Sequence, residues 1–109
     1  MKIPKKIKLI GRTIKIKFLD NLTQDRDLYG EAQFGVNKIL LQKRVKGNKL
    51  DDSQIGTTFL HELLHWVFYV MGESELRQNE KLIDAMSEIL YQVFAKNNID
   101  FREGKFNEK

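Results

Sequence analysis

The N-terminal part of the chain alternates between polar and apolar positions. In the segment KKIKLIGRTIKIKF, residues 5–18, aliphatic residues recur at every second position and most residues between them are lysines. A period of two is typical of β-strands with one buried face, and the glycine in the middle predicts a hairpin. Gly11 and Arg12 are placed at the two turn positions of a type II′ turn, so that Ile7 faces Ile16. The lysines then pair on the other side, which we expect to face solvent because like charges repel.

A second pair of strands is predicted within residues 28–43. The segment LYGEAQFGVNKILLQK has turn-forming residues near 35–37 and a strand through Ile39–Leu41, which we expect at an edge of the sheet. The preceding segment FLDNLTQDRDLYG is polar and irregular, and predicts a loop or a short helix. The segment RVKGNK predicts a basic loop that turns at Gly47 and Asn48.

The pattern changes to helical spacing near residue 51. Asp51, Asp52 and Ser53 are candidate N-caps, and their charge suits the start of a helix. The predicted helix runs to about Met71, with Gly72 as its stop signal. Apolar residues occupy nearly every face of this segment, which is typical of a helix that is buried in the centre of a domain.

A second helix is predicted from about Glu75 to Lys96. Its apolar stripe consists of Leu82, Met86, Ile89 and Val93, and is widened by Ile83, Leu90 and Phe94. Strands followed by helices predict the α+β class, with a small antiparallel sheet packed on the buried helix and on the second helix. One domain is expected over residues 1–109, with a tail from about residue 98.

Composition and charge narrow the classes of function. The chain has no cysteine, so cysteine nucleophiles and thiolate metal sites are excluded. The net charge is +4, and residues 1–17 contain seven basic residues and no acidic one. This basic segment suits a solvated strand face or an acidic partner. Nucleic acid is not favoured as the partner, because aromatic residues are not interleaved with the basic ones and no predicted helix is basic. No signal-peptide core or membrane span is present, which predicts a cytoplasmic protein.

The two histidines of the chain lie in the motif HELLH. His61 and His65 are four residues apart on the predicted helix, so both imidazoles lie on one face and can share a metal ion. Glu62 points elsewhere around the helix, in the position of the general base of HExxH metalloproteases. Two buried core histidines are the structural alternative, but burying them without partners is costly.

The third metal ligand must be a carboxylate, because no other histidine and no cysteine is present. Glu80 and Asp84 lie four residues apart on one face of the second helix, so Glu80 is the expected ligand. Asp84 is expected to accept the other N–H of a ligand histidine. The rival carboxylates are Glu73, Glu75 and Glu88.

The residues after HELLH also select among metallopeptidase classes. Metzincins need glycine three residues and histidine six residues after the second histidine, where this chain has Phe68 and Met71. HELLH followed by NEKLID instead resembles the HExxH and NExxxD pattern of the gluzincins, the thermolysin-like zinc metallopeptidases. The chain is also similar to small single-domain zincin-like proteins of bacteria and phages.

The resemblance implies a zincin-like fold, one Zn²⁺ per chain held by His61, His65 and Glu80, and Glu62 as the base. Thermolysin-like enzymes also use a histidine on the oxyanion, and this chain has no further histidine. The candidate replacements are Tyr29, Tyr69 and Tyr91. A chain of 109 residues is too short for a two-lobed cleft, so a partner or self-association is expected to complete the substrate groove.

The motif favours a metallopeptidase that hydrolyses peptide bonds with a zinc-activated water. Its substrate would be a peptide or a protein, bound by strand addition at a sheet edge. Two alternatives remain open. The first is a zinc protein without turnover, in which the metal joins two helices. The second is a phage or host interaction protein that uses the lysine face.

Overall fold

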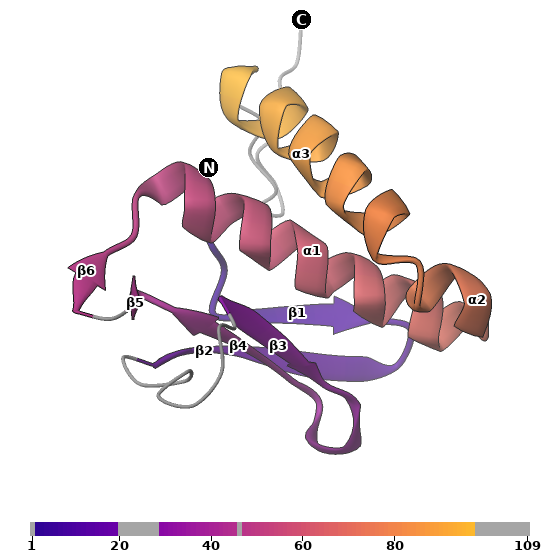
Figure 1. Ribbon diagram of the computed structural model, residues 1–109. Helices are drawn as coiled ribbons and strands as arrows, with labels where there is room; N and C mark the ends of the chain where they lie inside the picture. Colours follow the sequence, from indigo (N-terminus) through magenta and orange to yellow (C-terminus); the bar gives the residue numbers. More distant parts are fainter. Residues whose placement is uncertain (1, 20–28, 46, 98–109) are drawn as a thin grey trace, which may run out of the picture.

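The strands and helices form an α+β fold in layers (Figure 1). The computed structural model describes residues 2–19, 29–45 and 47–97. The strands are β1 (Lys6–Leu9), β2 (Arg12–Leu19), β3 (Gly30–Gln33), β4 (Lys38–Gln42), β5 (Arg44–Val45) and β6 (Asn48–Lys49). The helices are α1 (Asp52–Met71), α2 (Ser74–Arg77) and α3 (Glu80–Lys96), with a 3₁₀ turn at Phe34–Val36.

The N-terminal hairpin forms as predicted, but its turn lies one residue earlier. The turn residues are Ile10 and Gly11, with φ angles of 41° and 76°, so the placement of Gly11 and Arg12 in a type II′ turn is wrong. Two successive positive φ angles define a type I′ turn, whose twist matches that of the strands. The register changes by two residues, and Ile7 pairs with Ile14. A shift of two keeps every side chain on its predicted face.

The turn offers a simple test of this register. Ile10 is β-branched, 80% exposed and held at positive φ, which is unfavourable for such a side chain. We expect Ile10→Asn to raise the free energy of unfolding by about 1 kcal/mol, because asparagine followed by glycine suits a type I′ turn. Urea unfolding measures the change. Ile10→Val is the matched control and should give no gain; a loss of stability in Ile10→Asn would contradict the type I′ turn.

The sheet is mixed rather than antiparallel. Its strand order is β1-β2-β4-β3, with β2 and β4 parallel and the other two pairs antiparallel. The predicted pair with a turn near residues 35–37 is confirmed as β3 and β4. The expectation that Ile39–Leu41 forms an edge is wrong, because these residues belong to β4, between two neighbours. Their continuous apolar run is typical of a central strand that is buried on both faces.

The edge strand beside α1 is β3, the short strand Gly30–Gln33. The basic segment after β4 contains a small ribbon of β5 and β6 rather than only a loop. Most of the predicted polar loop, residues 20–28, and the tail from residue 98 lie outside the described residues.

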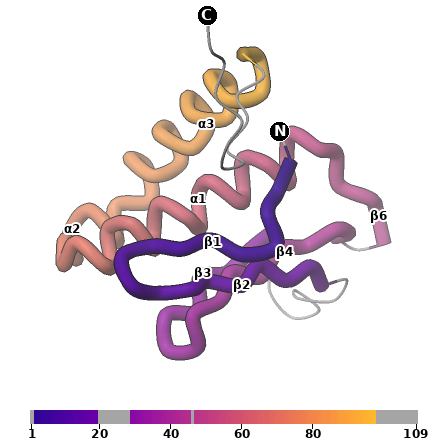
Figure 2. The backbone as a smooth tube through the Cα atoms, turned by 180° about the vertical axis from the view of Figure 1, so that it is seen from behind, coloured from indigo at the N-terminus to yellow at the C-terminus, as the bar shows by residue number. Residues whose placement is uncertain are grey.

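Helix α1 lies between the sheet and α3, as its apolar residues on nearly every face predicted (Figures 1 and 2). Asp51 caps its start in a capping box with Gln54, and Gly72 ends it with a φ angle of 75°. Towards the sheet, Trp66 is fully buried and donates a hydrogen bond from Nε1 to the Lys38 carbonyl at 3.1 Å. No helix in the described ranges is long and apolar enough to cross a membrane.

The second predicted helix is divided into two. The short α2 ends at Arg77, and α3 begins at Glu80 rather than at Glu75 because the Asn79 side chain accepts a hydrogen bond from the Leu82 N–H. The buried residues of α3 are Ile83 and Ser87. Two residues of the predicted apolar stripe, Ile89 and Val93, are instead exposed by 63% and 42%. The side of α3 that packs on α1 therefore carries Ile83 and Leu90, with Ser87 buried beside them.

Candidate metal centre

The two histidines project from α1 towards α3. They lie one helical turn apart, both are partly buried, and their Nε2 atoms are 3.2 Å from each other. The i and i+4 spacing that predicted a shared face thus brings the two imidazoles to a common point. The ring centres are 4.9 Å apart and the planes are tilted by 55°, so the rings are not stacked.

Helix α3 supplies the carboxylates that meet them. The Asn79 cap places Glu80 in the first turn of α3, where its Oε2 lies 3.0 Å from His61 Nε2 and its Oε1 lies 3.0 Å from His65 Nε2. One turn later, Asp84 Oδ1 lies 2.9 Å from His61 Nδ1. The structure therefore brings together the residues that the sequence selected: His61, His65, Glu80 and Asp84.

The hydrogen bonds of the two rings leave acceptor atoms facing one another. When Nδ1 of a neutral His61 ring donates to Asp84, Nε2 carries a lone pair. The His65 ring hydrogen-bonds to the Arg77 backbone, and burial is the main cause that lowers its pKa, so it favours the neutral form. Two imidazole lone pairs and both Glu80 oxygens then converge without a donor between them. Such a group is stabilised by a cation.

The geometry of these atoms suits a metal ion. The donor atoms of His61, His65 and Glu80 lie within 4.8 Å of one another, and this group could hold a metal. Their separations of 3.0 to 3.2 Å are close to the roughly 3.3 Å between ligands of a tetrahedral zinc. Among the described residues, the rival carboxylates Glu73, Glu75 and Glu88 do not belong to this group.

Glu62 lies on the inner side of α1, next to the edge strand. It is only 8% exposed, and the Ala32 backbone of β3 hydrogen-bonds to its carboxylate. Burial, with the Glu80 charge as the second cause, raises the pKa of Glu62 to about 8. Gly30 allows this close approach, because a Cβ there would lie 2.7 Å from Thr58 Cγ2 and 3.2 Å from Glu62 Cγ. Glu62 is thus a buried carboxyl group that can hold or release a proton near neutral pH.

The raised pKa of Glu62 predicts a pH dependence of the metal-free protein. Glu62 ionises in the unfolded chain above pH 4.5 but stays protonated in the folded chain up to about pH 8. The stability that protonated Glu62 contributes is therefore fully present below pH 4.5. It is lost as the pH rises from 4.5 through about 8. We expect the free energy of unfolding of Glu62→Gln to exceed that of the wild type by an amount that grows from pH 4.5 to on the order of 5 kcal/mol at pH 8. Urea unfolding of both proteins measures it, and a constant difference would contradict a buried, protonated Glu62.

A pocket of about 260 Å³ adjoins Glu62 and His61, between α1, α3 and the start of β3. Hydroxyl and acidic side chains line it: Tyr29, Thr57, Thr58, Asp84, Ser87 and Glu88. We name it the acceptor pocket. Its threonines and Ser87 were not predicted as site residues, because polar residues on a helix are usually solvent-exposed. The one available signal was the spacing of Asp84, Ser87 and Glu88 on one side of α3.

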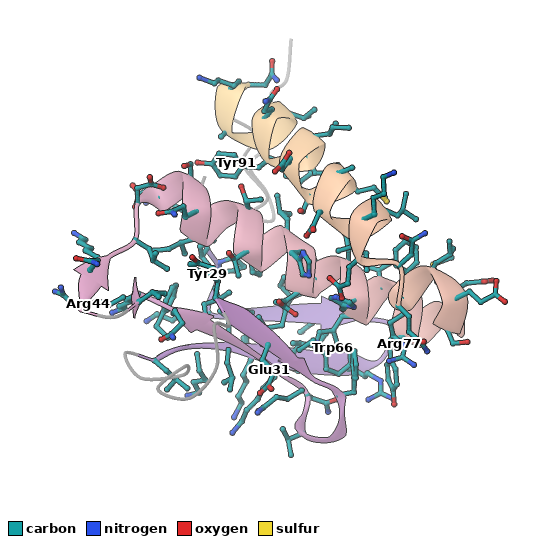
Figure 3. The ribbon with its side chains drawn as sticks, in the orientation of Figure 1. Tyr29, Glu31, Arg44, Trp66, Arg77 and Tyr91 are labelled. Carbon is teal, nitrogen blue, oxygen red and sulfur yellow. The ribbon has the colours of Figure 1, made fainter. Side chains whose placement is uncertain are left out.

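The three candidate tyrosines lie in different places, and Figure 3 shows two of them, Tyr29 and Tyr91. Tyr29 lines the acceptor pocket at the start of β3. Tyr91 lies against Gly56 near the start of α1, and Tyr69 stacks on Phe34 with ring centres 4.3 Å apart. Neither Tyr69 nor Tyr91 lines the pocket, and a substrate contact by any of the three tyrosines stays a prediction. Tyr29 is the tyrosine that remains beside the site.

The residues define a candidate metal centre with an adjacent buried carboxyl group. Comparison of the chain with protein-family models, with curated proteins and with solved structures finds no match. The chemistry of the site must therefore be argued from its own residues.

Proposed function

We propose that this protein is a zinc-dependent metallopeptidase. The observation that carries the proposal is the convergence of three metal-binding side chains beside Glu62, a buried carboxyl group that is not one of them. Two imidazoles and one carboxylate suit zinc in a catalytic site, because three protein ligands leave a position for water. When bound, zinc would supply an activated water and polarise the carbonyl of the substrate.

The residues of this chain would divide the remaining work. His61, His65 and Glu80 hold the metal, and Asp84 orients the His61 ring through Nδ1. Glu62 accepts the proton of the attacking water and donates it to the leaving amine. A group whose pKa lies near neutral pH can serve in both steps, and the pKa of Glu62 is raised into that range.

Strand β3 offers the expected place for an extended peptide. The Gln42 N–H donates to the Tyr29 carbonyl at 2.9 Å, so the alternate residues Gly30 and Ala32 direct their backbone groups away from β4. The hydrogen bond from Ala32 to Glu62 agrees with this direction. A peptide that adds to this edge would lie beside Glu62. The proposed peptide-binding edge is therefore β3 instead of the predicted Ile39–Leu41.

A purely structural zinc is the alternative, since the ligands join α1 to α3. Such a site does not require a buried carboxyl group next to its histidines, so Glu62 favours hydrolysis. The test is to incubate the zinc-loaded protein with a peptide library and to identify fragments by mass spectrometry. Cleavage that stops with a chelator and returns with zinc would support the proposal, and no cleavage of any peptide would contradict it.

A further inference from the structure

Two hydroxyl groups of the acceptor pocket already donate their protons to backbone carbonyls. Thr58 Oγ1 donates to the Gln54 carbonyl at 2.8 Å, and Ser87 Oγ donates to the Asp84 carbonyl at 3.0 Å. Each oxygen keeps its lone pairs, so both side chains can act only as acceptors without giving up these bonds. A ligand that hydrogen-bonds to these two oxygens must therefore bring donors.

The charges around the pocket have the same implication. Asp84 and Glu88 line it from α3, and no lysine or arginine does. The Asp84 carboxylate is engaged with His61 Nδ1, whereas Glu88 forms no ion pair within the described part of the chain. Glu88 is thus a carboxylate that lines a polar pocket and has no cationic partner among the described residues.

We propose that the acceptor pocket binds a cationic side chain, with arginine preferred, of the substrate residue beside the scissile bond. This inference rests on the proposed peptide hydrolysis. A guanidinium group brings five donors in a planar fork that matches a carboxylate, and has no acceptor to leave unpaired. Glu88 pairs with the charge, and Thr58 and Ser87 accept further hydrogen bonds. The enzyme therefore cleaves next to basic residues, with Glu88 as its specificity residue.

The test compares peptides that differ only at the residue beside the cleaved bond. We expect the wild type to prefer arginine over methionine about tenfold in kcat/KM, and Glu88→Gln to reduce this ratio to about twofold. Glu88→Lys should reverse the preference towards glutamate. Glu75→Gln is the matched control, an exposed acidic residue on α2 outside the pocket, and should keep the wild-type ratio. Cleavage without a basic preference would overturn this inference and leave the proposed hydrolysis intact.

A binding measurement separates the two proposals. Butylguanidinium is titrated against its neutral analogue butylurea by NMR, with wild type and Glu88→Gln. Selective binding of the cation that is lost in Glu88→Gln supports the pocket, even if no peptide is cleaved and the proposed hydrolysis fails. Equal binding of both compounds, or a cation affinity that does not change in Glu88→Gln, overturns the cation pocket.

Discussion

Replacing Glu62 by glutamine is expected to lower peptide hydrolysis on the order of a thousandfold while zinc stays bound. Glutamine keeps the size of the side chain and its position next to Ala32, but it cannot accept a proton from water. The proposed metal ligands are His61, His65 and Glu80, so the variant removes none of the proposed donor atoms. Measured kcat/KM and zinc content per chain, on the same preparation, test both parts of this expectation.

Two further variants complete the Glu62 experiment. Glu75→Gln makes the same chemical change on an exposed residue of α2 and should alter neither activity nor zinc content. His65→Ala should lose both zinc and stability, because it removes a ligand from a partly buried position. If Glu62→Gln lost zinc as fully as His65→Ala, Glu62 would be a ligand and its assignment as the base would be wrong.

The candidate metal centre was predictable because its information is local. The four-residue spacings of His61 with His65 and of Glu80 with Asp84 each place two side chains on one helix face. A short connection between α1 and α3 then makes a meeting of the two faces possible. The bounds of α1 were predictable for the same reason, since Asp51 and Gly72 are strong cap residues.

The strand arrangement depends on interactions that a local pattern does not contain. A hairpin turn at Gly11 and Arg12 and one at Ile10 and Gly11 put the same side chains on the same face, so alternation cannot distinguish the two registers. The parallel pairing of β2 with β4 joins segments separated by β3 along the chain. The edge position of β3 follows from that pairing, and it is what brings Ala32 to Glu62.

The acceptor pocket was not predictable from either helix alone. Thr58 and Ser87 are ordinary polar residues in sequence, and only the packing of α1 on α3 and β3 places them at one site. Gly30 shows the same dependence, since its need for a small side chain arises from Thr58 and Glu62 on another element. The acceptor pocket is therefore encoded less locally than the candidate metal centre.

The second large effect concerns the third metal ligand. The wild type is expected to bind about one zinc ion per chain, and Glu80→Ala to weaken this binding at least a hundredfold. The carboxylate of Glu80 contacts both histidines at 3.0 Å, so no other side chain in the described ranges replaces its oxygens. Elemental analysis after dialysis and calorimetric titration with zinc measure the loss.

Thermal unfolding with and without zinc gives an independent measure of the Glu80 prediction. A hundredfold loss of affinity removes up to about 2.7 kcal/mol of the stabilisation that saturating zinc gives. The Glu80 side chain is 61% exposed, so we expect its truncation to change the stability of the metal-free protein little, with the difference from wild type emerging when zinc is added. Glu88→Ala, the same truncation two turns later on α3, should respond to zinc like the wild type. Equal losses in Glu80→Ala and Glu88→Ala would overturn the choice of third ligand, and no zinc response in the wild type would leave HELLH as a packing motif.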